Sequence, residues 1–335
     1  GEGASYDVTG TITNAGETDN AFTYTLNDNT KAGNYTITKS EGKLKVTPVT
    51  SKVTVTVTGN TGSVTYDGSK HEVTGYNTSF SNVLYTATDF SFSGEAKAAR
   101  TDAGKTVMGL KAGQFANTSK NFTNVEFAVT DGYSEVTKRN VTLTSASDSR
   151  VYNGKPLRND KVTVSGDGFA TGEGATYDVT GSQTVAGSSE NTFTYTLNEG
   201  TNPDNYTITK AKGTLTVTNR DAKYEITVKA NSANTTYDGQ SHTAKGVETT
   251  TFEVDGNTYT VSGLKTENPV KTDAGRYTNN ITGTAVVKDA SGNDVTSQFT
   301  VKTENGNLVI SKRNVTLTSA SDSRVYNGKP LRNDK

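Results

Sequence analysis

The stretch Lys138–Lys161 reads KRNVTLTSASDSRVYNGKPLRNDK, and Lys312–Lys335 repeats all 24 residues unchanged, 174 positions later. Its first half alternates Val and Leu with Thr and Ser, which is the two-residue period of a half-buried strand. Its second half contains Tyr152-Asn153-Gly154, and Asn-Gly is a strong signal for a tight turn. A strand followed by a turn, recurring along the chain, predicts an all-β protein.

Further repeats divide the chain into related segments. Gly1–Gly10 (GEGASYDVTG) matches Gly172–Gly181 (GEGATYDVTG) at an offset of 171 residues. The tripeptide Tyr-Asp/Asn-Gly begins at Tyr66, Tyr152, Tyr237 and Tyr326, with spacings of 86, 85 and 89 residues. A fixed period of this kind is the signature of a repeat architecture, and two alternating repeats, type A and type B, account for it.

The repeats predict five segments. In chain order they are the C-terminal part of a type A repeat (1–47), a type B repeat (48–138), a type A repeat (139–219), a second type B repeat (220–312) and the N-terminal part of a type A repeat (313–335). Joined in the order 313–335 then 1–47, the two partial segments rebuild a type A repeat that lacks the equivalent of 162–171. We therefore expect either strand complementation between chains or a segment taken from a longer array.

Each repeat reads as a series of short strands with dense turn signals. The clearest strands are VTVTVTG (53–59), TFTYTLN (192–198), NYTITK (205–210), TLTVT (214–218) and FTVK (299–302). Their alternation predicts small antiparallel β domains, either immunoglobulin-like sandwiches or a β-grasp-like fold. Only Ala96–Arg100 suggests a helical turn. Connections as short as Thr47-Pro48-Val49 predict that the domains form an elongated rod.

Composition excludes several classes of function. The 34 basic and 35 acidic residues give a net charge of −1, which offers no attraction for nucleic acid or an anionic membrane. With no Cys and two His, the chain has no disulfide, thiolate nucleophile or Cys-based zinc site. No apolar run approaches 20 residues, so we expect no membrane insertion. A single Met, away from the first position, suggests a segment of a longer chain.

The type A sequence VYNGKPLRNDKVTVSGDGFATGEGATYDVTGSQTVAGSSENTFTYTLNEGTNPDNYTITKAKGTLTVT (151–218) resembles the MBG/YDG-type repeats of large adhesins on Gram-positive gut bacteria. The type B segments TYDGQSH (236–242), KTDAGRYTNNITGTA (271–285) and GNDVTSQFTV (292–301) resemble the usual companion of that repeat. The resemblance covers essentially the whole chain. It implies a secreted protein on the bacterial cell surface, whose repeats act as stalk or adhesive surface, and it supplies no catalytic residues.

Several residues are candidates for a site, each with a simpler structural interpretation. Tyr66, Tyr152, Tyr237 and Tyr326 either form a ligand surface or pack beside their turns. His71 and His242 are equivalent, and their roles are pH sensing or turn structure. The oxygen-rich loop 289–294 is either a calcium loop or a hairpin turn.

Two further features complete the search for chemistry. A Lys–Asn isopeptide bond would stabilise a Cys-free domain, but it needs an apposed, buried Lys, Asn and acid. Asn-X-Thr triplets at Asn34, Asn140 and Asn205 follow from the Thr-rich composition. No GxSxG, HExxH or P-loop motif occurs, so we predict no enzyme, no catalytic or metal residues and no cofactor.

The favoured function is a structural stalk or fibre of a surface adhesin that projects a binding region. The first alternative is that the repeats themselves bind a host glycan, mucin or matrix protein, with low affinity per repeat. The second is that chains assemble into a fibre, with 313–335 of one copy completing 1–47 of the next. The expected partners are therefore neighbouring repeats, further copies of this chain, or a host glycan or matrix protein.

Overall fold

The computed structural model describes residues 1–335 and is all-β. It contains 32 strands and four single-turn 3-10 helices. The residues form two compact units. Unit 1 consists of Gly1–Leu143, Val164–Thr176 and Thr196–Thr209, and unit 2 consists of Thr144–Thr163, Tyr177–Tyr195 and Lys210–Lys335.

The strands that lie wholly in unit 1 are β1 (Ala4–Val8), β2 (Gly16–Asn20), β3 (Phe22–Leu26), β4 (Gly42–Val46), β5 (Val53–Gly59), β6 (Thr61–Thr65), β7 (His71–Thr74), β8 (Tyr76–Phe80), β9 (Phe90–Phe92), β10 (Lys97–Arg100), β11 (Gly104–Val107), β12 (Phe115–Asn117), β13 (Val125–Thr130) and β14 (Tyr133–Thr137). Its 3-10 helices are η1 (Ala32–Asn34), η2 (Ala112–Gln114) and η3 (Pro203–Asn205).

The strands that lie wholly in unit 2 are β16 (Asp148–Val151), β19 (Gly187–Glu190), β22 (Thr214–Thr218), β23 (Tyr224–Lys229), β24 (Ala233–Thr236), β25 (His242–Thr243), β26 (Thr251–Val254), β27 (Asn257–Thr266), β28 (Val270–Lys271), β29 (Gly275–Asn279), β30 (Ile281–Asp289), β31 (Phe299–Glu304) and β32 (Gly306–Ser311), together with η4 (Thr296–Gln298). Five strands have residues in both units: β15 (Arg139–Ser145), β17 (Val162–Gly166), β18 (Ala175–Val179), β20 (Phe193–Leu197) and β21 (Tyr206–Ala211).

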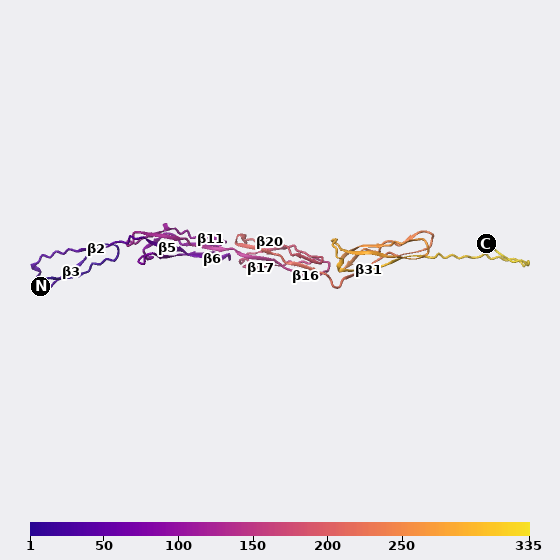
Figure 1. The fold of residues 1–335 in the computed structure, drawn as a ribbon, viewed down its shortest axis with the longest axis horizontal. Helices are drawn as coiled ribbons and strands as arrows, with labels where there is room; N and C mark the ends of the chain where they lie inside the picture. The colour runs from indigo at the N-terminus through magenta and orange to yellow at the C-terminus, as the bar shows by residue number, and fades with distance from the viewer. The chain divides into compact units, whose positions relative to one another are not determined.

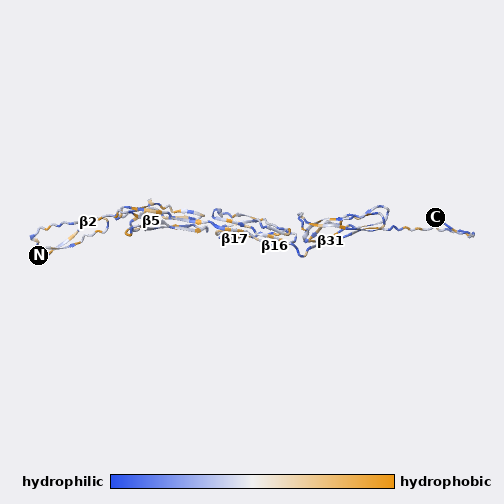
Figure 2. Ribbon diagram, viewed as in Figure 1, coloured by the Kyte–Doolittle hydropathy of each residue, from blue (hydrophilic) through white to orange (hydrophobic).

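The strands expected from alternation are confirmed, and β5 and β22 have the predicted bounds. In β5 the three Val side chains are buried, while its first two Thr residues are half-buried and exposed in turn. Figure 2 shows the same mixture of apolar and polar residues along the strands, without a long apolar segment. The expected helical turn at Ala96–Arg100 is wrong, because Lys97–Arg100 forms β10 and pairs with β7. A turn this short has too few helical hydrogen bonds to compete with sheet pairing.

The sheets are mixed, whereas the sequence analysis expected only antiparallel pairs. Within unit 1, β13 runs parallel to β5 and β14 parallel to β6. Within unit 2, β31 runs parallel to β23, β32 to β24 and β22 to β16. In each case a strand pairs with one about 70 residues later, which leaves room for the crossover of a dozen or more residues that a parallel pair needs. Alternation shows which face of a strand is buried and does not show its partner, so the expectation missed these pairs.

The core of unit 1 lies between small sheets rather than in one large layer. Val53, Val55 and Val57 of β5 pack with Phe115 of β12 and with Phe122. Phe115 also stacks on Phe92 of β9, with ring centroids 4.7 Å apart. This sandwich-like packing of β13-β5-β8 against β12-β9 gives a thin, aromatic core.

No helix in the structure is long and apolar enough to cross a membrane.

The last residues of unit 2 contrast with the identical sequence earlier in the chain. Residues 313–335 form no strand and are exposed throughout, and the yellow segment of Figure 1 runs away from the strands and turns back near the C-terminus. Leu317 is 92% exposed, whereas its equivalent, Leu143, is fully buried. The same 24 residues thus occur in a packed and an unpacked state within one molecule.

This pair of leucines gives a matched test of the core. We expect Leu143→Ala to lower the free energy of unfolding by about 2–5 kcal/mol, since it removes a buried side chain and leaves a cavity. Leu317→Ala, in dilute protein, should change it by less than about 0.5 kcal/mol. Urea denaturation followed by circular dichroism measures both, and equal effects would contradict the packing described here.

Candidate functional site: the tyrosines of the recurring turns

Tyr66 stands at the end of β6 and is held there by the parallel pair with β14. Its backbone N–H donates to the carbonyl oxygen of Thr137 at 2.9 Å. Asp67 and Gly68 form the turn that follows, and Gly68 has φ +82°, a left-handed conformation that Gly adopts without strain. The Tyr66 side chain is only 5% exposed. The turn is therefore fixed by backbone pairing, and its Tyr is directed into a packed environment.

The packed environment of Tyr66 is provided by residues more than 100 positions later, still within unit 1. The Tyr66 hydroxyl donates to Glu173 Oε1 at 2.5 Å, and the Tyr206 hydroxyl donates to Glu173 Oε2 at 2.5 Å. The two rings meet edge to face, with centroids 5.7 Å apart and an interplanar angle of 83°. We call Tyr66, Glu173 and Tyr206 the tyrosine clasp. One carboxylate thus joins two phenols that come from different predicted repeats.

A second set of contacts surrounds the tyrosine clasp. The buried Asn205 accepts from the Ala103 N–H at 2.7 Å and donates to Asp102 Oδ1 at 2.9 Å. Arg139 donates to the Tyr66 carbonyl oxygen and to the Gly168 carbonyl oxygen, each at 2.9 Å. The amide and the guanidinium satisfy backbone groups that the packing would otherwise leave without partners.

The local sequence places Asn205 and Tyr206 at this point. Asn205 is the last residue of the short helix η3, and Tyr206 follows it. Pro203 occupies the first turn of η3, and the Asn202 side chain accepts from the Asp204 N–H at 3.0 Å. Pro and Asn are favoured at these positions of a helix start. This turn places the Asn205 amide beside Asp102 and the Tyr206 hydroxyl beside Glu173.

The tyrosine clasp changes the acidity of its phenols. The hydrogen bond to the Glu173 carboxylate, with some burial, raises the pKa of Tyr66 to about 12. Burial, with the bond to the same carboxylate, raises the pKa of Tyr206 to about 12. Both phenols therefore stay protonated and act as donors across the neutral pH range. The arrangement binds and orients, and it offers no nucleophile.

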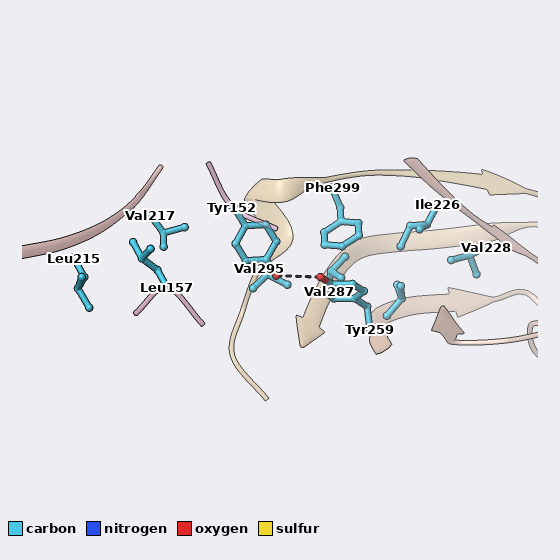
Figure 3. Close-up of a cluster of buried hydrophobic side chains, with 11 residues drawn as sticks. Tyr152, Leu157, Leu215, Val217, Ile226, Val228, Tyr259, Val287, Val295 and Phe299 are labelled. Carbon is cyan, nitrogen blue, oxygen red and sulfur yellow. Dashed lines mark hydrogen bonds between the residues drawn. The ribbon is translucent and has the colours of Figure 1, made fainter. Parts of the chain in front are cut away.

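Tyr152 occupies the equivalent place in unit 2 and is fully buried. Its hydroxyl lies 3.4 Å from the Tyr259 hydroxyl, the dashed contact of Figure 3. Figure 3 also shows Tyr152 between Leu157 and Val217 on one side and Val295 and Phe299 on the other, all members of one apolar cluster. Burial, together with the Tyr259 contact, raises the pKa of Tyr152.

An arginine again holds the backbone of this turn. Arg220 donates to the Tyr152 carbonyl oxygen at 3.3 Å and to the Tyr224 hydroxyl at 3.2 Å. Its guanidinium lies 4.0 Å from the centroid of the Tyr224 ring. Arg139 and Arg220 each come at the start of a predicted repeat and bind the turn Tyr of the preceding one. The two junctions share this arginine and differ in what covers the ring.

The other two turn tyrosines are not covered. Tyr237 is 40% exposed and Tyr326 is 94% exposed. Tyr237 follows β24, and its backbone pairs as that of Tyr66 does, because its N–H donates to the Ser311 carbonyl oxygen at 2.8 Å. The structure therefore brings two of the four predicted tyrosines into junctions between predicted repeats and leaves two at the surface.

The two histidines brace the turns of the type B repeats. His71 Nε2 lies 2.9 Å from Asp67 Oδ1, and His242 Nε2 lies 2.9 Å from Asp238 Oδ1. The contact with His71 is the main cause that lowers the pKa of Asp67. The Gln240 N–H, followed by His242, lowers the pKa of Asp238. This geometry agrees with the turn-structure interpretation of both histidines.

The remaining candidates have local partners. Asp289 accepts from the N–H groups of Ser291 and Asn293, both at 2.9 Å, which closes the loop 289–294 as a turn. No group of three or more acidic or histidine side chains in the structure is arranged to hold a metal ion. The buried Asn191 donates to two backbone carbonyls, and the buried Asn205 contacts Asp102, so both amides are engaged by groups other than Lys.

The sequence analysis assigned no junction role to Glu173, Arg139 or Asn205. A signal for each was present in the repeats. Glu173 recurs as Glu2 in the GEG motif, Asn205 recurs as Asn34, and Arg139 recurs as Arg313. Recurrence marks many other positions as well, so it did not distinguish these three residues.

No protein-family model matches this chain, and no curated protein sequence matches it.

Removal of one hydroxyl tests the tyrosine clasp. We expect Tyr66→Phe to lower the free energy of unfolding by about 1.5–3 kcal/mol, because the half-buried Glu173 carboxylate loses a donor. Tyr237→Phe, the matched change in the second type B repeat, should have an effect below about 0.5 kcal/mol in dilute protein. Urea denaturation measures both variants, and an unchanged midpoint for Tyr66→Phe would show that the clasp carries no energy.

The raised pKa values predict sensitivity to alkali. Folding favours the protonated phenols of Tyr66 and Tyr206, so their contribution to stability is complete below about pH 10. It is lost as the pH rises from 10 towards the folded pKa of about 12. Thermal unfolding across this range, with tyrosinate absorbance as the titration signal, measures the effect. In Glu173→Gln two phenols should titrate earlier, and an unchanged titration curve would contradict the assignment.

Proposed function

We propose that this chain is part of the structural stalk of a bacterial surface adhesin, and that its work is reach and stiffness. The observation that carries the proposal is the burial of two recurring turn tyrosines. Tyr66 and Tyr152 are buried at junctions between predicted repeats, where Glu173 and Tyr206, or Tyr259, cover them. Two of the four recurring tyrosines thus serve contacts between predicted repeats.

The connections between repeats support the same function. β14 ends at Thr137 and β15 begins at Arg139, so one residue separates the closing strand of a type B repeat from the opening strand of the next type A repeat. Arg139 is also the residue that binds the Tyr66 carbonyl oxygen. A connection this short, fixed by a side chain at the junction, limits rotation between neighbours and favours a stiff rod.

The bacterial cell surface as location is supported by the resemblance to MBG/YDG-type repeats, together with a chain that has no Cys and is rich in short strands. A stalk outside the cell is exposed to proteases, which cut mainly at exposed loop tips. Hydrogen-bonded strands and short loops make such a stalk resistant to proteolysis. The proposed partners in this function are the neighbouring repeats of the same chain.

Solution scattering tests the rod. Four repeats of about 35 Å each would extend about 140 Å, and a rod of that length has a radius of gyration of about 40 Å. A compact protein of this length has a radius of gyration of about 20 Å. We expect small-angle X-ray scattering of dilute protein to give a value near the larger figure, and a value near the smaller one would contradict the stalk.

A binding array separates the stalk from the adhesive alternative. The full chain, labelled and applied to glycans, mucins and matrix proteins, should show no binding at high micromolar concentration. Binding that persists in Tyr6→Ala and Tyr237→Ala, two of the exposed aromatics, would place a ligand site elsewhere on the repeats. Binding of any kind at low micromolar concentration would favour the adhesive function over the stalk.

A further inference from the structure

The opening and closing strands of each type B repeat lie side by side and run in the same direction. In the first type B repeat, β5 and β6 pair in parallel with β13 and β14. In the second, β23 and β24 pair in parallel with β31 and β32. The other strand pairs of the two repeats are antiparallel. Parallel strand pairing in a type B repeat thus joins the strands by which the chain enters and leaves it.

The parallel register continues without a shift across both small sheets. In the second type B repeat, Tyr224 lies opposite Phe299 and Thr236 lies opposite Ser311, each 75 positions later. In the first, every residue paired in β5 and β6 lies opposite the residue 72 positions later. We call β23 and β24, paired with β31 and β32, the parallel clamp of the second type B repeat. The strands β5, β6, β13 and β14 form the parallel clamp of the first.

Backbone contacts also hold the break between the two sheets of the clamp. In the second type B repeat, the Ala230 N–H donates to the Glu304 carbonyl oxygen at 2.9 Å, and the Asn307 N–H donates to Ser232 Oγ at 3.0 Å. Gly306 lies between these contacts, where a Cβ would come within 2.2 Å of a carbonyl oxygen of the opposite segment. Only a residue without a Cβ permits this close approach. The clamp is therefore continuous from one sheet to the next.

Ion pairs join the same strands on the exposed face. Lys229 Nζ lies 2.9 Å from Glu304 Oε2, and Lys302 Nζ lies 2.8 Å from Glu225 Oε2. Exposed pairs of this kind contribute little to the free energy of unfolding. They do favour one register, because a slip of two residues moves a strand by about 6.6 Å and separates each Lys from its Glu.

Apolar side chains hold the other face of the clamp. Ile226 and Val228 of β23 and Leu308 and Ile310 of β32 are buried. Movement of one clamp strand along the other would bring these side chains into water, and exposing apolar surface costs free energy. Sliding is therefore opposed by burial as well as by hydrogen bonds.

The direction of the pairing determines how a pulled chain loads these bonds. Because the strands are parallel, the start of β23 and the end of β32 lie at opposite ends of the clamp. Tension along the chain then acts along the strands and across their hydrogen bonds. The six residue pairs of β23 with β31 and the four of β24 with β32 share this load and must yield together. If the opening and closing strands were antiparallel, the same tension would act at one end, and their bonds would break one after another.

We propose that the type B repeats bear tension along the chain, and that the parallel clamp is the element that resists it by shear. This function goes beyond reach and stiffness, because a rod can be stiff to bending and still unfold when it is pulled. The direction of the load rests on the proposed stalk, since a stalk held at both ends is pulled along its chain. The resistance itself is a property of each repeat.

Single-molecule force spectroscopy of the full chain tests the clamp, because a chain without Cys accepts handles only at introduced thiols. Lys223→Cys with Lys312→Cys places handles before β23 and after β32, so the pull runs along the strands. Lys223→Cys with Ser297→Cys places both handles at the same end of the clamp, so the pull opens it pair by pair. We expect the first geometry to unfold at a force at least about twice that of the second, at one pulling speed.

The two double variants are matched controls for each other. Lys223, Ser297 and Lys312 are exposed, so urea denaturation should give both variants the same free energy of unfolding. A difference in force at equal stability depends on the direction of the pull alone.

A proline tests the hydrogen bonds of the clamp. Because the Glu304 carbonyl oxygen faces β23, the N–H groups of alternate residues in β31, including Thr300, also face β23. The Thr303 N–H faces away from β23, which is the only strand paired with β31. Both Thr side chains are exposed. We expect Thr300→Pro to lower the force measured along the strands, and Thr303→Pro, the control, to leave it unchanged.

Equal forces in the two pulling geometries would overturn the proposal, as would equal effects of the two proline variants. The comparison of geometries uses exposed positions only, so it decides the matter even where Thr300→Pro does not fold. Equal forces would leave the scattering of a rod unaffected. A compact radius of gyration would contradict the stalk and leave the difference in force, so the two functions are tested independently.

Discussion

The constraint on which this structure depends is that a turn Tyr is buried by residues of another repeat. A domain of about 85 residues buries a small fraction of its surface and is marginally stable by itself. This chain has no Cys, so it cannot form a disulfide. The rings of Tyr66 and Tyr152 are each buried at a junction. An arginine donates a hydrogen bond to the carbonyl oxygen of the same Tyr. At these two junctions, one predicted repeat thus buries its turn Tyr against residues of the next.

The identical 24-residue segments show that burial at these positions depends on the neighbour as well as on the local sequence. Tyr152 and Tyr326 have the same residues on both sides, yet one is fully buried and the other almost fully exposed. Asp148–Val151 forms β16 because β22 is beside it, while Asp322–Val325 has no partner strand. A short strand with no neighbour gains no cross-strand contacts, and those contacts are the main source of sheet stability.

The sequence predicted what depends on local pattern. The two-residue period located strands such as β5 and β22, and the Asp/Asn-Gly pairs located the turns beside the four tyrosines. The parallel pairs were not predicted, because a partner about 70 residues away leaves no mark on the alternation of either strand. Glu173 was missed for the same reason, since 107 residues separate it from Tyr66. The repeats were the only long-range signal, and they identify equivalent positions rather than contacts.

The two junctions solve the same problem with different chemistry, and the difference has a physical consequence. Tyr152 lies in an apolar cluster, where close packing supplies the energy. Tyr66 shares a carboxylate with Tyr206, and that carboxylate is satisfied only when both hydroxyls are aligned with it. A misaligned neighbour would leave a charge poorly solvated, which costs more than the aligned bond contributes. The polar junction therefore selects one orientation. An all-apolar junction would lack this selectivity, because apolar contacts have no directional requirement.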